Sequence, residues 1–130
     1  MIADTDTPEP TIYHVCRSDE WAQALAAGVY RGSSQDKADG FIHFSAADQV
    51  RASVAKHRAG QDDLVILSVD PDALEPGTLK WESSRGGALF PHLYTPLPVI
   101  AVVRTDPLML GDDGVHVFPA DIGATERDGL

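Results

Sequence analysis

Short runs of β-branched and aromatic residues are spaced along the whole chain, and each run predicts a strand. The runs are residues 11–16 (TIYHVC), 41–45 (FIHFS), 64–69 (LVILSV), 79–82 (LKWE) and 99–104 (VIAVVR). These residue types favour the extended conformation because their side chains pack well on a pleated surface. The run at 64–69 is almost entirely apolar, which predicts a buried strand.

Helical spacing of apolar residues occurs in two segments, both in the first half of the chain. The first is expected to begin at Ser18, a favourable N-cap, and to end at Gly28. Its apolar residues recur at helical intervals: Trp21, Ala24 and Leu25. The second is expected to open at Ser45 and to end before Gly60. On one face of this segment, helical spacing brings together Val50, Val54 and His57.

Turn-forming residues predict that several other segments are irregular. Residues 29–40 end in the turn pair Asp39-Gly40, so we expect a loop there, and residues 83–88 form a Gly-rich loop. Residues 90–98 (FPHLYTPLP) contain three prolines and predict an ordered turn rather than a long regular element. The order of elements predicts an α+β fold, with a split, antiparallel-rich sheet and two early helices.

Negative charge is concentrated at the two ends of the chain. The 130 residues include 20 acidic and 10 basic side chains, so the formal net charge is −10. Residues 1–10 and 108–130 hold eight of those acids and little periodic hydrophobicity. We therefore expect a flexible leader at 1–10, a single α+β domain at 11–107, and an acidic tail at 108–130 that is at most partly docked. A chain this acidic argues against DNA and against a large RNA as partners.

The single cysteine, Cys16, excludes both a disulfide within the chain and a zinc site built from several thiolates. Its place at the end of an apolar strand predicts an inert, buried thiol. No apolar run approaches the roughly 18 residues that span a bilayer, and the N-terminus lacks the features of a signal peptide. We expect a cytoplasmic protein without a membrane partner, and the sequence does not give its oligomeric state.

Five histidines, at positions 14, 43, 57, 92 and 116, are the main candidates for chemistry. Imidazole donates or accepts hydrogen bonds near neutral pH, but each ring can equally satisfy a backbone group at the edge of the core. His14 and His43 lie in predicted strands, and alternation places His43 and Ser45 on one face, so we expect these three side chains to line one cavity. Because no HExxH or HxH motif occurs, we expect no metal, although the histidines and Glu82 could converge on one.

Glu82 and the proline-bounded segment supply the other polar candidates. Glu82 lies at a strand end beside a Gly-rich loop, where a carboxylate is either solvated or positioned on a bound polar ligand. His92 and Tyr94 are two residues apart, so an extended backbone puts both on one face and turns Leu93 towards the core. We interpret this segment as one wall of a pocket. The alternative is a packing turn in which His92 bonds a neighbouring carbonyl.

Several motifs occur in a fixed order between residues 11 and 105. They are Tyr13-His14, Trp21, Gly28-Val29-Tyr30, residues 40–45 (GFIHFS), Trp81-Glu82 and residues 90–97 (FPHLYTPL). This ordered set resembles a family of small bacterial proteins, domain-of-unknown-function family 952. That family resembles the ADP-ribosyltransferase fold, and the first half of the chain is similar in layout to the RNA 2′-phosphotransferase branch of that fold.

The resemblance implies roles for particular residues. It matches His14 to a first-strand histidine that holds an NAD ribose hydroxyl, His43 to a second-strand histidine, and Ser45 to the small polar residue that follows. A glutamate near a late strand often polarises the nicotinamide ribose in this fold. Glu82 and His92 are both counterparts of that glutamate, and the choice between them stays open.

The leading functional expectation is an enzyme that binds NAD or a related nucleotide and transfers or removes an ADP-ribosyl-type group on a small substrate. Breaking the nicotinamide–ribose bond produces an oxocarbenium-like cation, which a nearby carboxylate stabilises. The expected catalytic residues are His43, Glu82 and His92, and the expected cofactor-binding residues are His14, Ser45, Tyr94 and Arg85. The alternatives are a non-catalytic nucleotide- or metabolite-binding domain and a metal-dependent hydrolase that uses the histidines.

Overall fold

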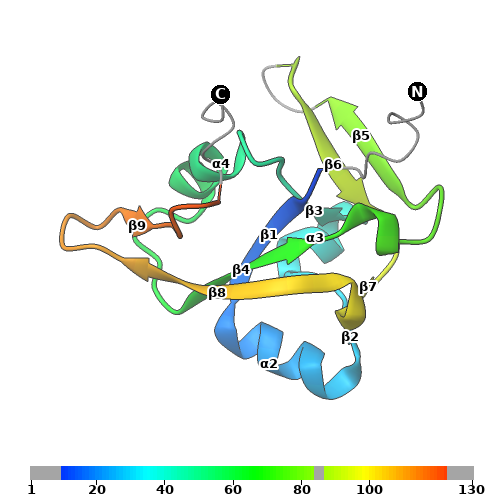
Figure 1. Cartoon of the computed structure of the whole chain (residues 1–130), viewed down its shortest axis with the longest axis horizontal. Helices are drawn as coiled ribbons and strands as arrows, with labels where there is room; N and C mark the ends of the chain where they lie inside the picture. Colours follow the sequence, from blue (N-terminus) through cyan, green and yellow to red (C-terminus); the bar gives the residue numbers. More distant parts are fainter. Residues whose placement is uncertain (1–9, 84–86, 123–130) are drawn as a thin grey trace.

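The computed structural model describes residues 10–83 and 87–122 (Figure 1). Its strands are β1 (Ile12–Arg17), β2 (Val29–Tyr30), β3 (Ile42–His43), β4 (Leu64–Val69), β5 (Leu79–Ser83), β6 (Leu89–Leu93), β7 (Leu97–Pro98), β8 (Val102–Leu110) and β9 (His116–Val117). Its helices are α2 (Ser18–Ala27), α3 (Ser34–Asp39) and α4 (Val50–His57), with 3₁₀ turns at Pro71–Ala73 and Val99–Ala101.

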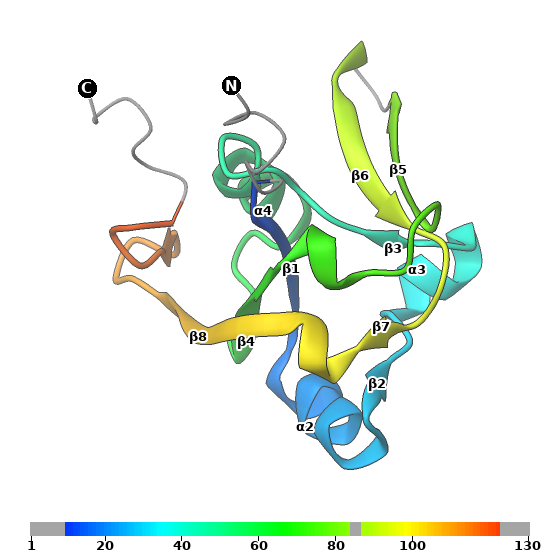
Figure 2. The same ribbon diagram turned by 45° about the vertical axis from the view of Figure 1, so that its right-hand side comes forward.

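The strands form three sheets, in the orders β1-β4-β8-β9, β2-β7 and β3-β6-β5, and every strand pair among them is antiparallel. An isolated bridge between Tyr13 and Ser45 ties the end of the β3 segment to β1. In Figure 2 the β5–β6 hairpin projects away from the β1-β4-β8 sheet. The expected α+β class with a split, antiparallel-rich sheet is confirmed.

The β1-β4-β8 sheet separates two hydrophobic cores. Leu67 on β4 faces the first core, to which α2 contributes Trp21. Ile66, its neighbour on the same strand, faces the second core together with Val54 of α4. Helices therefore cover the two faces of the sheet (Figure 1), which explains why the run at 64–69 is apolar at almost every position.

Helix α2 ends at Gly28 as predicted, but its N-cap is Arg17 rather than Ser18, and α4 is shorter than expected. The α2 N-cap is Arg17, whose backbone N–H donates to Glu20 Oε1 at 3.0 Å, and Gly28 ends the helix at φ 85°. The expected start of the next helix at Ser45 is wrong, because α4 begins at Val50. The preceding residues form a turn in which the Ala46 N–H donates to the Gln49 side chain at 2.9 Å.

Residues 29–40 are not the expected loop, because they contain β2 and α3. Ser33 and Asp36 form a capping box at the start of α3, and Gly40 ends the helix at φ 87°. The expectation of two early helices is therefore wrong, since the part of the chain that the structure describes has three, all before residue 60. A six-residue polar helix carries no apolar periodicity, so only its caps could have predicted it.

Residues 90–98 also contain more regular structure than expected, because β6 and β7 lie within and around them. Pro91 lacks an N–H donor, but its carbonyl accepts a 2.9 Å hydrogen bond from the Phe44 N–H and so takes part in the pairing of β6 with the β3 segment. The expected strand at 99–104 begins instead with a 3₁₀ turn and continues as β8 to Leu110. The expected domain boundary at 107 falls inside this strand, and Leu108 and Ile122 beyond it are both 1% exposed.

Within the described residues, no helix is long and apolar enough to cross a membrane.

Candidate functional site

The β3-β6-β5 sheet has one apolar face and one polar face. Ile42, Leu93 and Leu79 lie opposite one another on the three strands and pack against the first core. Side chains alternate along a strand, so the neighbouring residue at the same level of each strand belongs to the other face. That row consists of His43, His92 and Lys80. The expectation that Leu93 turns to the core is confirmed.

Glu82, His92 and Tyr94 form a hydrogen-bonded group on the polar face. His92 Nδ1 donates to Glu82 Oε1 at 2.8 Å, and the Tyr94 hydroxyl donates to the same oxygen at 2.6 Å. The Phe41 ring stacks on His92 with a centroid distance of 4.1 Å and an interplanar angle of 24°. His43 lies beside this group, with its ring centroid 5.6 Å from that of His92.

Two polar atoms of this group have no partner in the described part of the chain; the Glu82 side chain is 38% exposed and the His92 side chain is 9% exposed. Among residues 10–83 and 87–122, His92 Nε2 and Glu82 Oε2 have no hydrogen-bond partner. The hydrogen bonds from Tyr94 and His92 lower the pKa of Glu82, and the bond to Glu82 raises the pKa of Tyr94. Glu82 is therefore an anion at neutral pH, and it fixes the Nδ1–H tautomer of His92 so that Nε2 can accept a proton.

Asp36 is the centre of a second, buried group. Its carboxylate is 3% exposed and accepts hydrogen bonds from the Ser33 N–H at 2.7 Å and the Ser33 hydroxyl at 3.0 Å. It also accepts from the His43 N–H at 3.1 Å and from His43 Nδ1 at 2.5 Å. The backbone packs so closely here that a Cβ at Gly32, where φ is +97°, would lie 2.7 Å from the Asp36 Cβ.

His43 is held between two carboxylates. Besides the bond to Asp36, its Nε2 lies 3.0 Å from Asp39 Oδ2, so both ring nitrogens face an acceptor. The hydrogen bond to Asp36 raises the pKa of His43. Burial alone would raise the pKa of Asp36, but the His43 side-chain hydrogen bond and the backbone N–H groups of Ser33 and His43 lower it to about 2. We conclude that His43 is an imidazolium near neutral pH.

His14 lies behind this group and has no free nitrogen. Its ring is 5% exposed; Nδ1 donates to the His43 carbonyl at 2.6 Å, and Nε2 accepts from the Tyr30 hydroxyl at 2.8 Å. Burial lowers the pKa of His14, so the ring is neutral. His14 and His43 lie close together, and Nε2 of His14 is also 3.7 Å from Asp36, but neither ring lines the cavity described below. Cys16 is buried in the same core, and burial raises the pKa of its thiol to about 12.

Ser45 does not share the environment of the two histidines. Its backbone exchanges two 2.8 Å hydrogen bonds with Tyr13, and directly opposed residues of an antiparallel pair lie on the same face. Ser45 therefore lies on the Tyr13 side of β1, whereas the next residue, His14, faces the other side. Arg85, the other expected cofactor contact, lies outside the described residues.

A cavity of about 320 Å³ is lined by Phe41 and Tyr94, which contact the Glu82–His92 pair, and by Ile42 and Leu93 of the apolar face. Its walls include Asp36, Phe41, Tyr94 and two cations that the sequence analysis did not connect, Arg31 and Lys37. Arg31 follows β2 and Lys37 belongs to α3, so the missed elements between residues 29 and 40 bring these charges to the site. Only a predicted helix at residues 34–39 would have indicated that Lys37 lies at this site.

Within residues 10–83 and 87–122, no three His, Cys, Asp or Glu side chains are grouped so that they could hold a metal ion. His43, His92, Glu82 and Tyr94 do converge, and His14 contacts the same group from the core side. The structure thus brings five of the seven expected site residues together.

The chain belongs to a family described as a protein of unknown function, DUF952, whose model matches residues 15–105. It is similar to CC0527 from Caulobacter crescentus. The crystal structure of that protein is 48% identical and superimposes with a TM-score of 0.78, covering 82% of this chain and 93% of CC0527. The solution NMR structure of CC0527 gives 50% identity and a TM-score of 0.71, with 81% and 90% covered. No curated protein matches the chain.

Proposed function

We propose that the protein is a cytosolic enzyme that binds NAD or a related nucleotide and transfers or removes an ADP-ribosyl-type group on a small substrate. The observation that carries the proposal is a cavity with two cations and two aromatic rings, Phe41 and Tyr94, which contact His92 and Glu82 directly. NAD would supply a glycosidic bond whose cleavage leaves positive charge on the ribose. The roles below belong to the side chains of the chain itself.

The cavity suits the anionic and aromatic parts of a nucleotide. Arg31 and Lys37 are the cationic groups of its wall and would hold phosphate oxygens. Phe41 and Tyr94 give the wall an aromatic surface against which a base can pack; their ring centroids lie 5.2 Å apart, and the rings are tilted by 43°. Lys80 adds a third positive charge, with Nζ 5.3 Å from the centre of the Tyr94 ring.

Glu82 and His92 are placed for two different tasks. The anionic Glu82 keeps one oxygen free for a ribose hydroxyl and stabilises positive charge that develops nearby. His92 Nε2 is the one ring nitrogen of the pair that is free to accept a proton from an attacking hydroxyl or water. His43 is already an imidazolium bonded to two carboxylates, so it contributes charge and position rather than a proton-accepting site.

The residues fit a nucleotide with one exception. A ribose hydroxyl has no free atom on His14 to bind, because both ring nitrogens already have partners inside the protein. We therefore assign the contact with the ribose hydroxyl to Glu82. His14 positions the β3 backbone through its hydrogen bond to the His43 carbonyl.

Calorimetric titration of the full chain with NAD, ADP-ribose and AMP tests binding, and chromatography of released nicotinamide tests turnover. We expect Arg31→Gln and Lys37→Gln each to weaken binding about tenfold, the usual worth of one charge-assisted hydrogen bond. Lys56→Gln, an exposed lysine of α4 outside the cavity, is the matched control and should bind normally.

Glu82→Gln should abolish nicotinamide release and leave NAD affinity within a few fold, since the carboxylate acts on charge that develops during the reaction. Failure of all three nucleotides to bind would contradict the proposal. Tight binding with no release by the unmodified protein would instead support the non-catalytic binding domain.

A further inference from the structure

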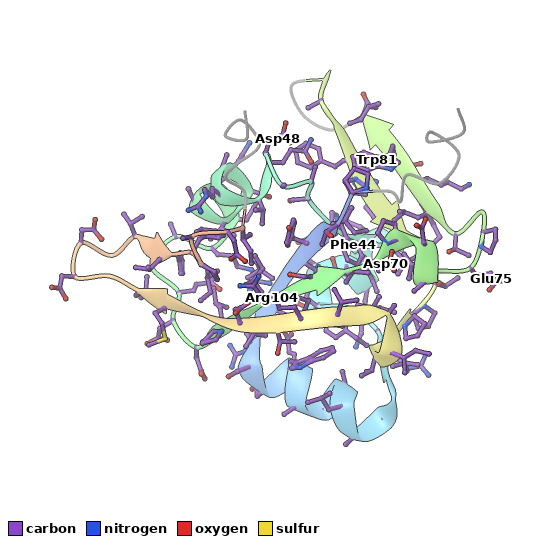
Figure 3. All side chains as sticks on the ribbon, viewed as in Figure 1. Phe44, Asp48, Asp70, Glu75, Trp81 and Arg104 are labelled. Carbon is purple, nitrogen blue, oxygen red and sulfur yellow. The ribbon has the colours of Figure 1, made fainter. Side chains whose placement is uncertain are left out.

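The side of β5 that faces away from Glu82 borders a second cavity. Leu79 and Trp81 alternate with Lys80 and Glu82 along the strand, and both of them line this cavity of about 340 Å³. The rest of the lining comes from the 3₁₀ turn Pro71–Ala73 and the turn that follows it. Figure 3 labels Trp81 on β5 and Glu75 in the second of these turns. The cavity is thus separate from the site proposed above.

The walls of this cavity are preformed. Asp70 accepts a 2.9 Å hydrogen bond from the Asp72 N–H and so fixes the start of the 3₁₀ turn. The Glu75 carbonyl accepts from the Thr78 hydroxyl at 2.7 Å, which closes the next turn. Pro71 and Pro76 restrict the backbone further. A ligand therefore does not have to order this region when it binds.

The lining combines an exposed indole with uncompensated negative charge. Trp81 is 41% exposed, whereas the other tryptophan, Trp21, is 8% exposed in the core. Asp72 and Glu75 are the charged residues of the wall, and neither carboxylate forms an ion pair with any part of the chain that the structure describes. Leu74 and Leu79 complete an apolar floor.

This combination favours a ligand that carries a positive charge on an apolar stem. An indole face attracts ammonium and guanidinium groups, and carboxylates beside it add Coulomb attraction and hydrogen-bond acceptors. The volume lies at the small end of ligand sites, which suits a short molecule rather than an extended peptide. We propose that this cavity, formed by Trp81, Asp72 and Glu75, binds a small aliphatic amine or guanidine.

The test uses agmatine, which carries an ammonium and a guanidinium group on a four-carbon stem, as the probe. Titration of the full chain is followed by the indole N–H signals of the two tryptophans in ¹H–¹⁵N NMR spectra, with the Trp81 signal assigned by its loss in Trp81→Phe. We expect the Trp81 signal to shift and saturate with a Kd below about 1 mM, while the Trp21 signal stays in place. Pentanol, a neutral molecule with a comparable stem, should not produce the shift.

The double variant Asp72→Asn/Glu75→Gln should weaken agmatine binding at least about tenfold. Asp62→Asn/Asp112→Asn removes the same charge from exposed positions elsewhere and should bind as the unmodified chain does. Equal weakening in both double variants would overturn the proposal, because it would mean general charge attraction. Absence of a saturating Trp81 shift, or a shift with a lysine-rich peptide but not with agmatine, would overturn it too.

Discussion

Two groups of polar side chains lie on either side of Phe41, and they use histidine and carboxylate in opposite ways. Around Asp36, every oxygen and ring nitrogen has a partner inside the protein, and the carboxylate is almost fully buried. Around Glu82, the carboxylate is 38% exposed, and one oxygen and one ring nitrogen remain free. The same residue types therefore form a structural centre in one place and an open site in the other.

The difference shows why residue type alone did not identify the reactive histidine. A buried carboxylate is tolerated only when it is fully hydrogen-bonded, so the Asp36 group stabilises the fold and fixes α3 against β3. The Glu82–His92 pair, in which each side chain keeps one polar atom without a partner, contributes less to stability and can exchange protons with a ligand. The predictions below test this division.

The largest expected effect comes from removing the centre of the buried group. Asp36→Ala leaves the Ser33 and His43 donors without an acceptor, and loss of one partner of a buried ion pair costs about 3–5 kcal/mol. Urea denaturation should show this loss as a lower midpoint with an unchanged slope. Glu82→Ala, the matching deletion in the open group, should leave the midpoint unchanged. Comparable losses in the two variants would contradict the division.

A smaller destabilisation is expected from Gly32→Ala. The alanine Cβ would lie 2.7 Å from the Asp36 Cβ, at a positive φ that side chains rarely adopt. We expect a loss of about 2 kcal/mol, the sum of left-handed backbone strain and a small displacement of the aspartate. Gly114→Ala is the matched control, since its φ is +81° but a Cβ there meets nothing within 4 Å. The difference between the two variants measures the Asp36 contact alone.

The two histidines of the buried group should give stability opposite pH dependences. The pKa of His43 is raised above 6.5, so its contribution is complete below pH 6.5 and is lost as pH rises through the folded value. The pKa of His14 is lowered, so stability is lost as pH falls below 6.5. Asp36 adds a further loss only as pH falls from 3.8 towards about 2. The free energy of unfolding, measured from pH 4 to 9, should therefore show a maximum near pH 6.5, the ordinary pKa of histidine.

His43→Asn separates these contributions, because it keeps a donor for Asp36 but cannot titrate. The decline above pH 6.5 should disappear in this variant, and the decline below pH 6.5 should remain. A decline on the alkaline side that persists would show that His43 is not the imidazolium described above.

The sequence predicted the parts of the structure that depend on local pattern. The β-branched runs located β1, β4 and β5, and alternation correctly placed His92 and Tyr94 on one face with Leu93 in the core. It did not predict α3, because a short helix held by Ser33 and Asp36 lacks an apolar stripe. Asp36 was missed for the same reason. Whether a ring nitrogen of His14 or His92 is free depends on contacts between distant segments, and no local pattern records those.

The smallest expected effect is that of Ser45→Ala. This variant tests a cofactor contact that the family resemblance implied but that lies away from the other site residues. Ser45 is 6% exposed and lies on the Tyr13 side of β1, away from the open atoms of Glu82 and His92. Its two hydrogen bonds to Tyr13 are made by the backbone, so alanine preserves them. We expect a stability change within about 1 kcal/mol and NAD affinity unchanged within error in the same calorimetric titration. Tyr94→Phe is the paired variant, because it removes a hydroxyl of similar polarity from the open group. If Ser45→Ala weakens binding and Tyr94→Phe does not, the ligand occupies the Tyr13 side of the sheet, and the open group around Glu82 is not the binding site.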